Sequence, residues 1–360
     1  MTRTNATLVL AAATLVLLGP TVRAEEKPTV IRIGFAGVGA GGRPVAGGNP
    51  TAIATDHGAL EAEFKADGIT IKSTYFTGAG PAVNEALANG QLDFAQQGDL
   101  PALVAKAGGL PTKLILAQTR FDAIYVNAPA ASSARSLEDL KGKRIAVFKG
   151  TNLQLAFARV LKAKGLKETD FKLINMAISD SNAALLSNDI DAQVSGPDVF
   201  PLVDRGVARI VYSSADDPKL GRVSHLLVTE RFAARYPQIV QRVVNALLRE
   251  AAWLADDGNR ARAYQIWAKS GYGLPSWKGD WDRFVLRDRT SPLFDEFYRA
   301  QYRRLLDAAR ELKLVRRDID LDAWLDPTFL DRGLETLGLK GVWRELDAEG
   351  KPKVAAVVNR

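Results

Sequence analysis

Short apolar runs alternate with helical runs between about residue 30 and residue 229. The apolar runs have the length of strands, and several of the helical runs stop at a glycine. The predicted strands cover 31–35, 69–76, 92–95, 113–117, 144–148, 171–175 and 190–194. The predicted helices cover 51–66, 81–89, 100–107, 152–164 and 181–187. This alternation predicts an α/β fold with mostly parallel sheets and right-handed crossovers.

The last third of the chain is mostly helical, and Ile239, Val243, Leu247 and Ala251 fall on one predicted helix face. The first two thirds contain an internal echo. Segment 84–93 aligns without gaps with segment 182–191, and Gly98 then falls on Gly196. Segments this short can coincide by chance, but the alignment favours two similar α/β lobes.

The N-terminus has the pattern of an export signal. Arg3 precedes an apolar run over 6–18, and Val22-Arg23-Ala24 offers small residues to a signal peptidase. The run is too short to span a bilayer core of about 30 Å. We therefore predict a signal peptide over 1–24, cleaved after Ala24. Because the chain has no cysteine to carry an acyl group or a disulfide, we expect a freely diffusing periplasmic protein that is not lipid-anchored.

Composition narrows the chemistry. The 360 residues, 25% charged and 47% hydrophobic, suit a soluble protein of about two domains. The net charge of +7 drops by two when the predicted signal is removed, and no block of Lys and Arg marks a nucleic-acid partner. With two histidines and no cysteine, we expect no metal site, no cofactor and no catalytic triad.

One motif points elsewhere. Strand 31–35 leads into Gly37-Val38-Gly39-Ala40-Gly41-Gly42, which fits the dinucleotide-binding pattern G-x-G-x-x-G. However, the following segment, 43–50, contains two prolines and two more glycines and cannot begin a packed helix. An exported nicotinamide-dependent oxidoreductase therefore stays a distant alternative. We interpret the segment as a glycine-rich loop at the carboxyl end of a strand, where open α/β sheets bind ligands.

Three predicted helix starts, at 77–81, 149–152 and 179–182, offer backbone N–H groups to an anion. Such caps also serve helix stability alone. All three follow predicted strands, so we expect them at one edge of the sheets.

Segment 136–151, Ser-Leu-Glu-Asp-Leu-Lys-Gly-Lys-Arg-Ile-Ala-Val-Phe-Lys-Gly-Thr, resembles a stretch found in periplasmic substrate-binding proteins of ABC transporters. The similarity is to the branch that serves aliphatic sulfonates, taurine and nitrate, and it extends over about 31–271. Two segments depart from the family pattern. The loop over 38–49 is longer and richer in glycine, and the turn over 195–198 replaces a segment that often contains tryptophan.

The resemblance implies a two-lobed type II periplasmic-binding-protein fold, in which each lobe is a mostly parallel sheet flanked by helices. Two hinge crossings are expected near 121–126 and 209–213. Lobe one then comprises 30–121 plus 216–335, lobe two comprises 122–215, and 336–360 form a C-terminal extension that packs on lobe one. All six tryptophans follow residue 250, and we expect them to be structural parts of lobe one.

The implied function is the capture of a small organic anion, such as an aliphatic sulfonate. The lobes would close over it by a hinge motion, and a membrane permease would recognise the closed monomer. Alternatives within the fold are a binding protein for nitrate, a sulfate ester, an aromatic acid or a pyrimidine. A related enzyme that makes a thiamin pyrimidine has a cysteine-rich motif, which this chain lacks.

Candidate site residues follow from these expectations. Arg43 and Arg120 are the predicted counter-charges for the anion. Asp198, on the wall opposite Asp99, would suit a ligand that also carries an amine. His225 could reach the cleft, although a lone histidine more often packs structurally. The predicted ligand-binding residues are Gly37, Arg43, Thr77, Gly80, Pro81, Gln97, Gly98, Asp99, Arg120, Thr151, Asn152, Ser179, Ser195, Gly196, Asp198 and His225.

Overall fold

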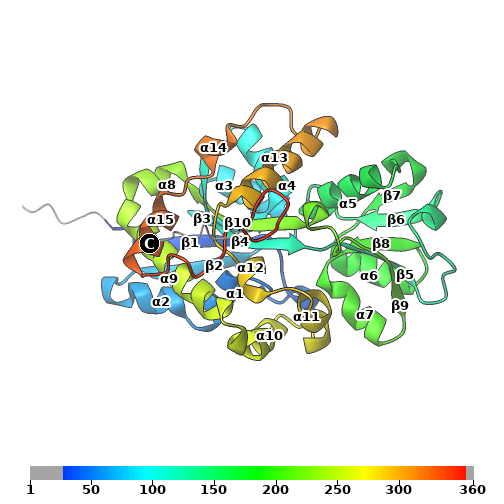
Figure 1. Ribbon diagram of the computed structural model, residues 1–360, viewed down its shortest axis with the longest axis horizontal. Coiled ribbons are helices and arrows are strands. Elements are labelled where there is room, and N and C mark those ends of the chain that lie inside the picture. The colour runs from blue at the N-terminus through cyan, green and yellow to red at the C-terminus, as the bar shows by residue number, and fades with distance from the viewer. Residues whose placement is uncertain (1–26, 354–360) are drawn as a thin grey trace, which may run out of the picture.

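The computed structural model describes residues 27–353, which form two lobes built on two five-stranded sheets (Figure 1). The predicted signal peptide, its cleavage after Ala24 and the last residues of the predicted C-terminal extension lie outside the described residues. The predicted α/β class is confirmed, since helices cover both sheets (Figure 1).

The first sheet has the strand order β2-β1-β3-β10-β4. Strands β1, β2 and β3 are parallel to one another, whereas β10 runs antiparallel to β3 and β4. Its strands are β1 (Val30–Phe35), β2 (Thr70–Tyr75), β3 (Phe94–Gly98), β4 (Thr112–Asp122) and β10 (Arg222–Thr229).

The second sheet repeats this plan with the order β7-β6-β8-β5-β9. Here β6, β7 and β8 are parallel, and β5 runs antiparallel to β8 and β9. Its strands are β5 (Tyr125–Pro129), β6 (Arg144–Val147), β7 (Lys172–Asn175), β8 (Ala192–Ser195) and β9 (Ala208–Ser213). In both sheets the antiparallel strand is the first one after the chain arrives from the other lobe.

Helices are distributed unequally between the lobes (Figure 1). The second lobe has α5 (Asn152–Ala163), α6 (Ile178–Leu186) and α7 (Phe200–Asp204). The first lobe has α1 (Pro50–Asp56), α2 (Ala59–Phe64), α3 (Ala79–Ala88), α4 (Asp99–Ala107), α8 (Glu230–Arg235), α9 (Pro237–Ala255), α10 (Arg260–Ala268), α11 (Leu274–Trp281), α12 (Leu286–Arg289), α13 (Glu296–Glu311), α14 (Leu321–Trp324) and α15 (Thr328–Thr336). Among residues 27–353, no helix combines the length and apolarity needed to cross a membrane.

Each lobe has its own apolar core. Alternate residues Ile31 and Ile33 of β1 are buried in the first core, which also contains the predicted apolar face over 239–251 of α9. Ile145 and Val147 of β6 are buried in the second core with Phe157 of α5. Because each sheet packs against its own helices, each lobe is a separately packed unit, and the chain joins the two units at the crossings.

The first crossing is short, since only residues 123 and 124 separate β4 from β5. The return crossing differs from the prediction near 209–213. That segment belongs to β9 and pairs with β5, so the chain leaves the second sheet after Ser213 and crosses over 214–221. The return crossing packs against the end of β4, where Gly221 lies against the backbone of Phe121.

The C-terminal segment packs on the first lobe as far as residue 353. Trp343 joins the first core, and Leu346 donates its backbone N–H to Asp295 at 3.1 Å. Gly350 lies against the rings of Phe297 and Phe121, so this segment also contacts the end of β4 just before the first crossing.

Candidate functional site

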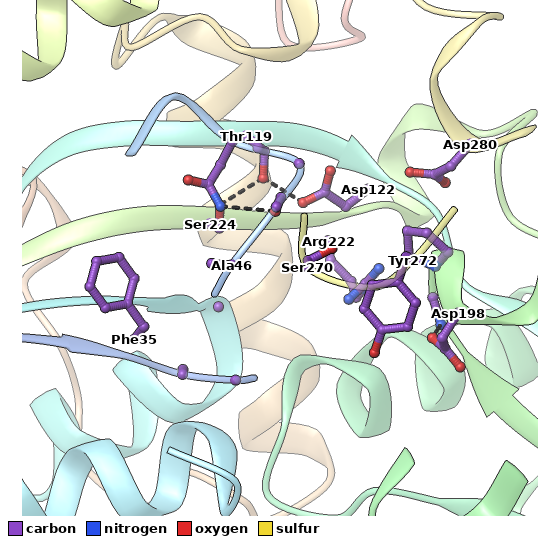
Figure 2. Close-up of a pocket in the computed structure, with 18 of the residues that line it drawn as sticks. Phe35, Ala46, Thr119, Asp122, Asp198, Arg222, Ser224, Ser270, Tyr272 and Asp280 are labelled. Carbon is purple, nitrogen blue, oxygen red and sulfur yellow. Dashed lines mark hydrogen bonds between the residues drawn. The ribbon is translucent and has the colours of Figure 1, made fainter. Parts of the chain in front are cut away.

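A cavity of about 300 Å³ lies between the two lobes. Its lobe-one wall is formed by the loop after β1, the ends of β3 and β4, the start of β10, and helices α11 and α12. Its lobe-two wall is formed by the starts of α5 and α6 and by the turn after β8. Figure 2 shows side chains from these segments converging around it. Since the parallel strands end at this boundary, the cavity occupies the usual ligand position of an α/β sheet.

Arg222, the first residue of β10, supplies an unpaired cation to the cavity (Figure 2). Its guanidinium donates to the carbonyl oxygen of Ala123 at 2.8 Å and to Oδ1 of Asn152 at 3.4 Å. Its Nε is buried without a hydrogen-bond partner. Within residues 27–353, Arg222 forms no ion pair with a carboxylate. Arg222 therefore offers free hydrogen-bonding capacity to an anion at the cavity, while the carboxylates of Asp122 and Asp198 act on its charge without pairing with it.

Arg289, by contrast, is a buried cation whose charge is already compensated. It pairs with Asp122 at 3.1 Å and with Asp280 at 2.6 Å, and its guanidinium lies 3.7 Å from the centre of the Trp281 ring. Asp280 also accepts from Tyr125 of the second lobe at 2.6 Å. This network fixes one wall of the cavity and ties it to the start of β5.

Asp198 lines the cavity from the second lobe. Its Oδ1 accepts the backbone N–H of Gly196 at 2.9 Å, whereas its Oδ2 is buried and has no partner. Burial raises the pKa of the Asp198 carboxyl to about 6, against the lowering effects of the Gly196 N–H and of Arg222. The free oxygen can accept a hydrogen bond from a ligand.

Hydroxyl groups line the back of the cavity. Thr119 and Ser224 have their side-chain oxygens 2.7 Å apart, and Thr119 also donates to Asp122 (Figure 2). These groups come from neighbouring strands β4 and β10. They give this wall hydrogen-bonding capacity but no net positive charge.

Aromatic rings form another part of the wall. Trp277 and Trp281 of α11 line the cavity together with Tyr272, and the loop after β1 packs on Trp277 through Gly47. All six tryptophans belong to the apolar packing of lobe one, as predicted: Trp253, Trp267, Trp277, Trp281, Trp324 and Trp343. Two of the six, Trp277 and Trp281, also lie where they can touch a ligand.

Six of the sixteen predicted residues line the cavity. They come from the loop after β1, the end of β3, the start of α5 and the turn after β8. These residues are Gly37, Gln97, Gly98, Asn152, Gly196 and Asp198.

The two predicted counter-charges lie elsewhere. Arg120 is fully buried, pairs with Asp295 at 2.6 Å and donates to the carbonyl oxygen of Leu293 at 2.8 Å. Neighbouring side chains of a strand point to opposite faces, so in β4 Thr119 faces the cavity and Arg120 faces away. Arg43 is exposed beside Gly271. Of the two described arginines that do line the cavity, Arg222 and Arg289, only Arg222 has no ion pair.

Three more predicted residues, Thr77, Pro81 and Ser179, are exposed and do not line the cavity. Ser179 lies next to Ile178, which does line it. Pro81 instead contacts Gly150 across the lobe boundary. The start of α3 therefore reaches the boundary between the lobes without reaching the cavity, whereas α6 reaches the cavity through Ile178 and not through Ser179.

The remaining predicted residues are buried outside the cavity: Gly80, Asp99, Thr151, Ser195 and His225. Thr151 caps α5 and donates to the carbonyl oxygen of Phe148 at 2.7 Å. Ser195 donates to Asn127 at 2.9 Å. His225 lies 2.6 Å from the hydroxyl of Tyr302, and burial lowers its pKa to about 3, so the ring is neutral. These side chains serve the packing of the lobes.

Sequence reasoning missed Arg222, Tyr272, Trp277, Asp280 and Arg289 as lining residues. Arg222 carried a usable signal, because it follows the return crossing directly. Trp277, Asp280 and Arg289 lie in helices with no motif around them, and Tyr272 lies in the short loop before α11. Within residues 27–353, no three His, Asp or Glu side chains gather as a metal site.

Comparisons with known proteins agree with this geometry. Residues 64–261, more than half of the chain, match the family described as NMT1/THI5 like. A protein of Bacillus subtilis (strain 168) named for the binding of aliphatic sulfonates is 26% identical over 295 residues, which cover 80% of this chain and 85% of that protein.

Solved structures share the fold. The chain is 29% identical to a crystal structure from Methylobacillus flagellatus KT, named as the periplasmic sulfonate-binding protein of an ABC transporter. Their TM-score is 0.75, and the match covers 88% of this chain and 97% of that one. The desulfurization enzyme DSZB also has this fold, with 18% identity, a TM-score of 0.67 and coverage of 85% of this chain and 99% of its own. The predicted type II periplasmic-binding-protein fold is confirmed.

Proposed function

Because the chain belongs to the NMT1/THI5-like family of substrate-binding proteins, we propose that it captures a small organic sulfonate in the cavity between its lobes and delivers it to an ABC importer. The resemblance predicted from residues 136–151 is confirmed by this membership. In the delivery step, a membrane permease recognises the closed monomer with its bound ligand. The compartment we propose is the periplasm, reached after cleavage behind Ala24.

The unpaired guanidinium of Arg222 is the observation that carries the proposal. A sulfonate presents three oxygens around one negative charge, and a guanidinium matches such a group through several directed N–H bonds. Arg222 also contacts the first crossing through Ala123 and the second lobe through Asn152. An anion bound there stabilises an arrangement that exists only when the lobes meet.

The rest of the cavity supports an organic body on the anion. Tyr272 and Trp277 provide an apolar wall, whereas nitrate would leave this surface uncovered. The free Oδ2 of Asp198 favours a ligand that also carries an amine, as taurine does. We therefore place an amine-bearing sulfonate first, ahead of plain alkanesulfonates, sulfate esters, aromatic acids and nitrate.

We propose binding without catalysis. The enzyme that shares the fold shows that this architecture can also hold reactive groups. The present sequence contains no cysteine nucleophile. The histidine predicted for the site, His225, lies outside the cavity and is buried against Tyr302. The acidic and basic groups that do line the cavity are suited to holding a ligand by charge and hydrogen bonds.

A ligand screen tests the proposal. The chain from Glu25 onward is mixed with taurine, alkanesulfonates, nitrate, sulfate esters and aromatic acids, and thermal unfolding is followed for each. A ligand at 100 times its Kd should stabilise the fold by about 2.7 kcal/mol. We expect the largest shift with a sulfonate and its loss in R222A. A shift in thermal unfolding with nitrate or aromatic acids alone would replace the sulfonate assignment. No shift with any of the anions would refute the proposed function.

A further inference from the structure

The lobes touch on two opposite sides of the cavity. On one side the start of α4 in lobe one meets the start of α5 in lobe two, and on the other α11 meets α7 (Figure 1). At each contact a glycine of lobe one receives a side chain of lobe two. The pairs are Gly98 with Asn152 and Gly279 with Phe200.

Gly98 leaves room for Asn152 that any other residue would fill. A Cβ added at position 98 would lie 2.3 Å from Nδ2, 2.7 Å from Cγ and 3.0 Å from Cβ of Asn152. The Cβ of Asn152 is fixed by the first turn of α5, so a rotation of its amide cannot relieve the whole overlap. The backbone of Gly98 is extended, with φ −85° and ψ 177°, which alanine also adopts. Glycine is therefore required here by the other lobe.

Gly279 makes the matching contact on the other side. A Cβ there would lie 2.4 Å from Cε1 and 2.5 Å from Cδ1 of Phe200. Gly279 lies inside α11, where alanine would favour the helix. The ring of Phe200 can turn, so this contact tolerates a methyl group better than Gly98 does and needs a larger side chain to be blocked.

We propose that Gly98 and Gly279 are closure seats: positions where the missing side chain of lobe one lets lobe two come fully onto the ligand. The inference rests on the proposed function and deepens it. Seating at Gly98 places Asn152 3.4 Å from the guanidinium of Arg222, so closure on this side also orients the anion-binding cation. A side chain at either seat holds the lobes apart without disturbing either lobe by itself.

The consequence is a change in the population of the closed state. If only the closed form holds ligand tightly, the apparent Kd rises in proportion as the closed fraction falls, so a tenfold drop in that fraction gives about a tenfold weaker Kd. The association rate should change little, because the open form still admits ligand. The dissociation rate should rise, because the closed complex reopens more readily.

Double-mutant cycles test the seats. G98A and G279V are each measured alone and together with removal of the opposing side chain, N152G or F200A. We expect about a tenfold higher Kd for G98A in the native background and less than about twofold in the N152G background, since coupling appears only between contacting residues. The pair G279V and F200A should behave in the same way. Phe200 is not a lining residue of the cavity. G273A, at the start of the same helix α11 and with only an ordinary contact at 3.4 Å, is the matched control and should bind as the native protein does.

A distance measurement reads closure directly. The absence of cysteine allows spin labels at K72C and K172C, on the exposed outer strands β2 and β7 of the two sheets. We expect G98A and G279V to shift the label distances toward the open form, with and without a saturating sulfonate. Unchanged distances and affinities, or equal losses in both backgrounds of each cycle, would overturn the seats. A native protein that binds no sulfonate would instead refute the proposed function, and the distances measured without ligand would still decide the seats.

Discussion

The two lobes share one plan and differ where the third strand ends. Each sheet inserts its antiparallel strand at the fourth position. Each also joins the strand at the second position to the start of the third with the same pair: Arg32 of β1 binds Asp93 just before β3, and Arg144 of β6 binds Asp191 just before β8. The aligned glycines lie where these third strands end: Gly98 is the last residue of β3, and Gly196 follows β8. A buried acid comes within two residues of each glycine, Asp99 in lobe one and Asp198 in lobe two.

These two acids have different uses. In lobe one, Asp99 accepts the backbone N–H groups of Leu100 at 2.7 Å and Val223 at 3.0 Å, so both of its oxygens hold the fold together. In lobe two, Asp198 uses one oxygen for Gly196 and leaves the other buried without a hydrogen-bond partner. The acid after the third strand is thus fully used by the fold in lobe one and only half used in lobe two.

The largest effect should come from the cation between the lobes. R222A removes the unpaired guanidinium, and the loss of a charge-assisted contact to a buried anion should weaken sulfonate binding about 100-fold. Isothermal titration measures it. R43A is the control, since Arg43 is exposed and outside the cavity, and it should bind nearly as the native protein does. If the two variants lost affinity equally, the anion would not be bound by Arg222.

The next effect separates the two acids by stability. D99A leaves the buried N–H of Val223 without an acceptor and should lower the free energy of unfolding by about 2 kcal/mol. D198A removes one backbone contact but also an unpartnered buried carboxylate oxygen, so its change should be much smaller. Denaturant unfolding without ligand compares the two. Equal losses would mean that Asp198 is as structural as Asp99.

The pH dependence of binding distinguishes the acids again. Burial raises the pKa of Asp198 to about 6, so its carboxylate, the form that attracts an amine, gains population as the pH rises from 5 to 7.5. Arg222, Asp280 and Tyr272 are the charged or titratable neighbours that act on it. Taurine affinity should improve about tenfold over this range. D198N should remove this gain, and a plain alkanesulfonate should not show it. A flat profile for taurine would mean that Asp198 does not meet the amine.

The free energy of unfolding should fall with rising pH, whereas the affinity for taurine should increase. Burial also raises the pKa of Asp99 to about 6, above its ordinary 3.8. Between about pH 4 and 6 the folded state therefore holds more protons than the unfolded state, and the free energy of unfolding falls as the pH rises, by up to about 1.4 kcal/mol per pH unit for one such group. D99N should flatten this slope in urea titrations at several pH values. A slope that stays unchanged in D99N would assign it to other carboxyls.

The smallest effect concerns the aromatic wall of lobe one. Y272A removes apolar contact with the body of the ligand and should cost about 1 kcal/mol, or roughly fivefold in Kd. The loss should grow with the length of the alkyl chain of the sulfonate, which a titration series measures. A loss that is the same for short and long sulfonates would show that Tyr272 acts on the head group instead.

The sequence predicted the regular parts of the fold better than the parts made by tertiary contacts. The alternation of strands and helices located most strands of both sheets, but the predicted helix over 51–66 is divided at Gly58, whose φ is 62°. Strand β10 was missed, because it is buried on both faces and places Ser224 and His225 among its apolar residues. Without β10, the return crossing was placed one strand too early.

The site divides in the same way. Glycine turns at strand ends led to Gly98, Asn152, Gly196 and Asp198, because position at a strand end is a local property of the sequence. Trp277 and Asp280 reach the cavity because α11 of lobe one lies at the lobe boundary, where it packs on α7. Arg120 was a wrong candidate because it lies one position from Thr119 and therefore faces the opposite side of β4. The predicted strand ended at residue 117, whereas β4 continues to Asp122, so the sequence did not show which face each of these residues takes.

The position of β10 also constrains the order of folding. This strand lies between β3 and β4, although the whole second lobe separates it from β4 in the chain. Until residue 229 is available, the first sheet has a gap in its middle, whereas every strand of the second sheet lies within 125–213. Pairing across so long a stretch of chain is slow, because loop closure is paid for before any contact forms. The second lobe can thus be complete while the first still lacks the strand that pairs with both β3 and β4.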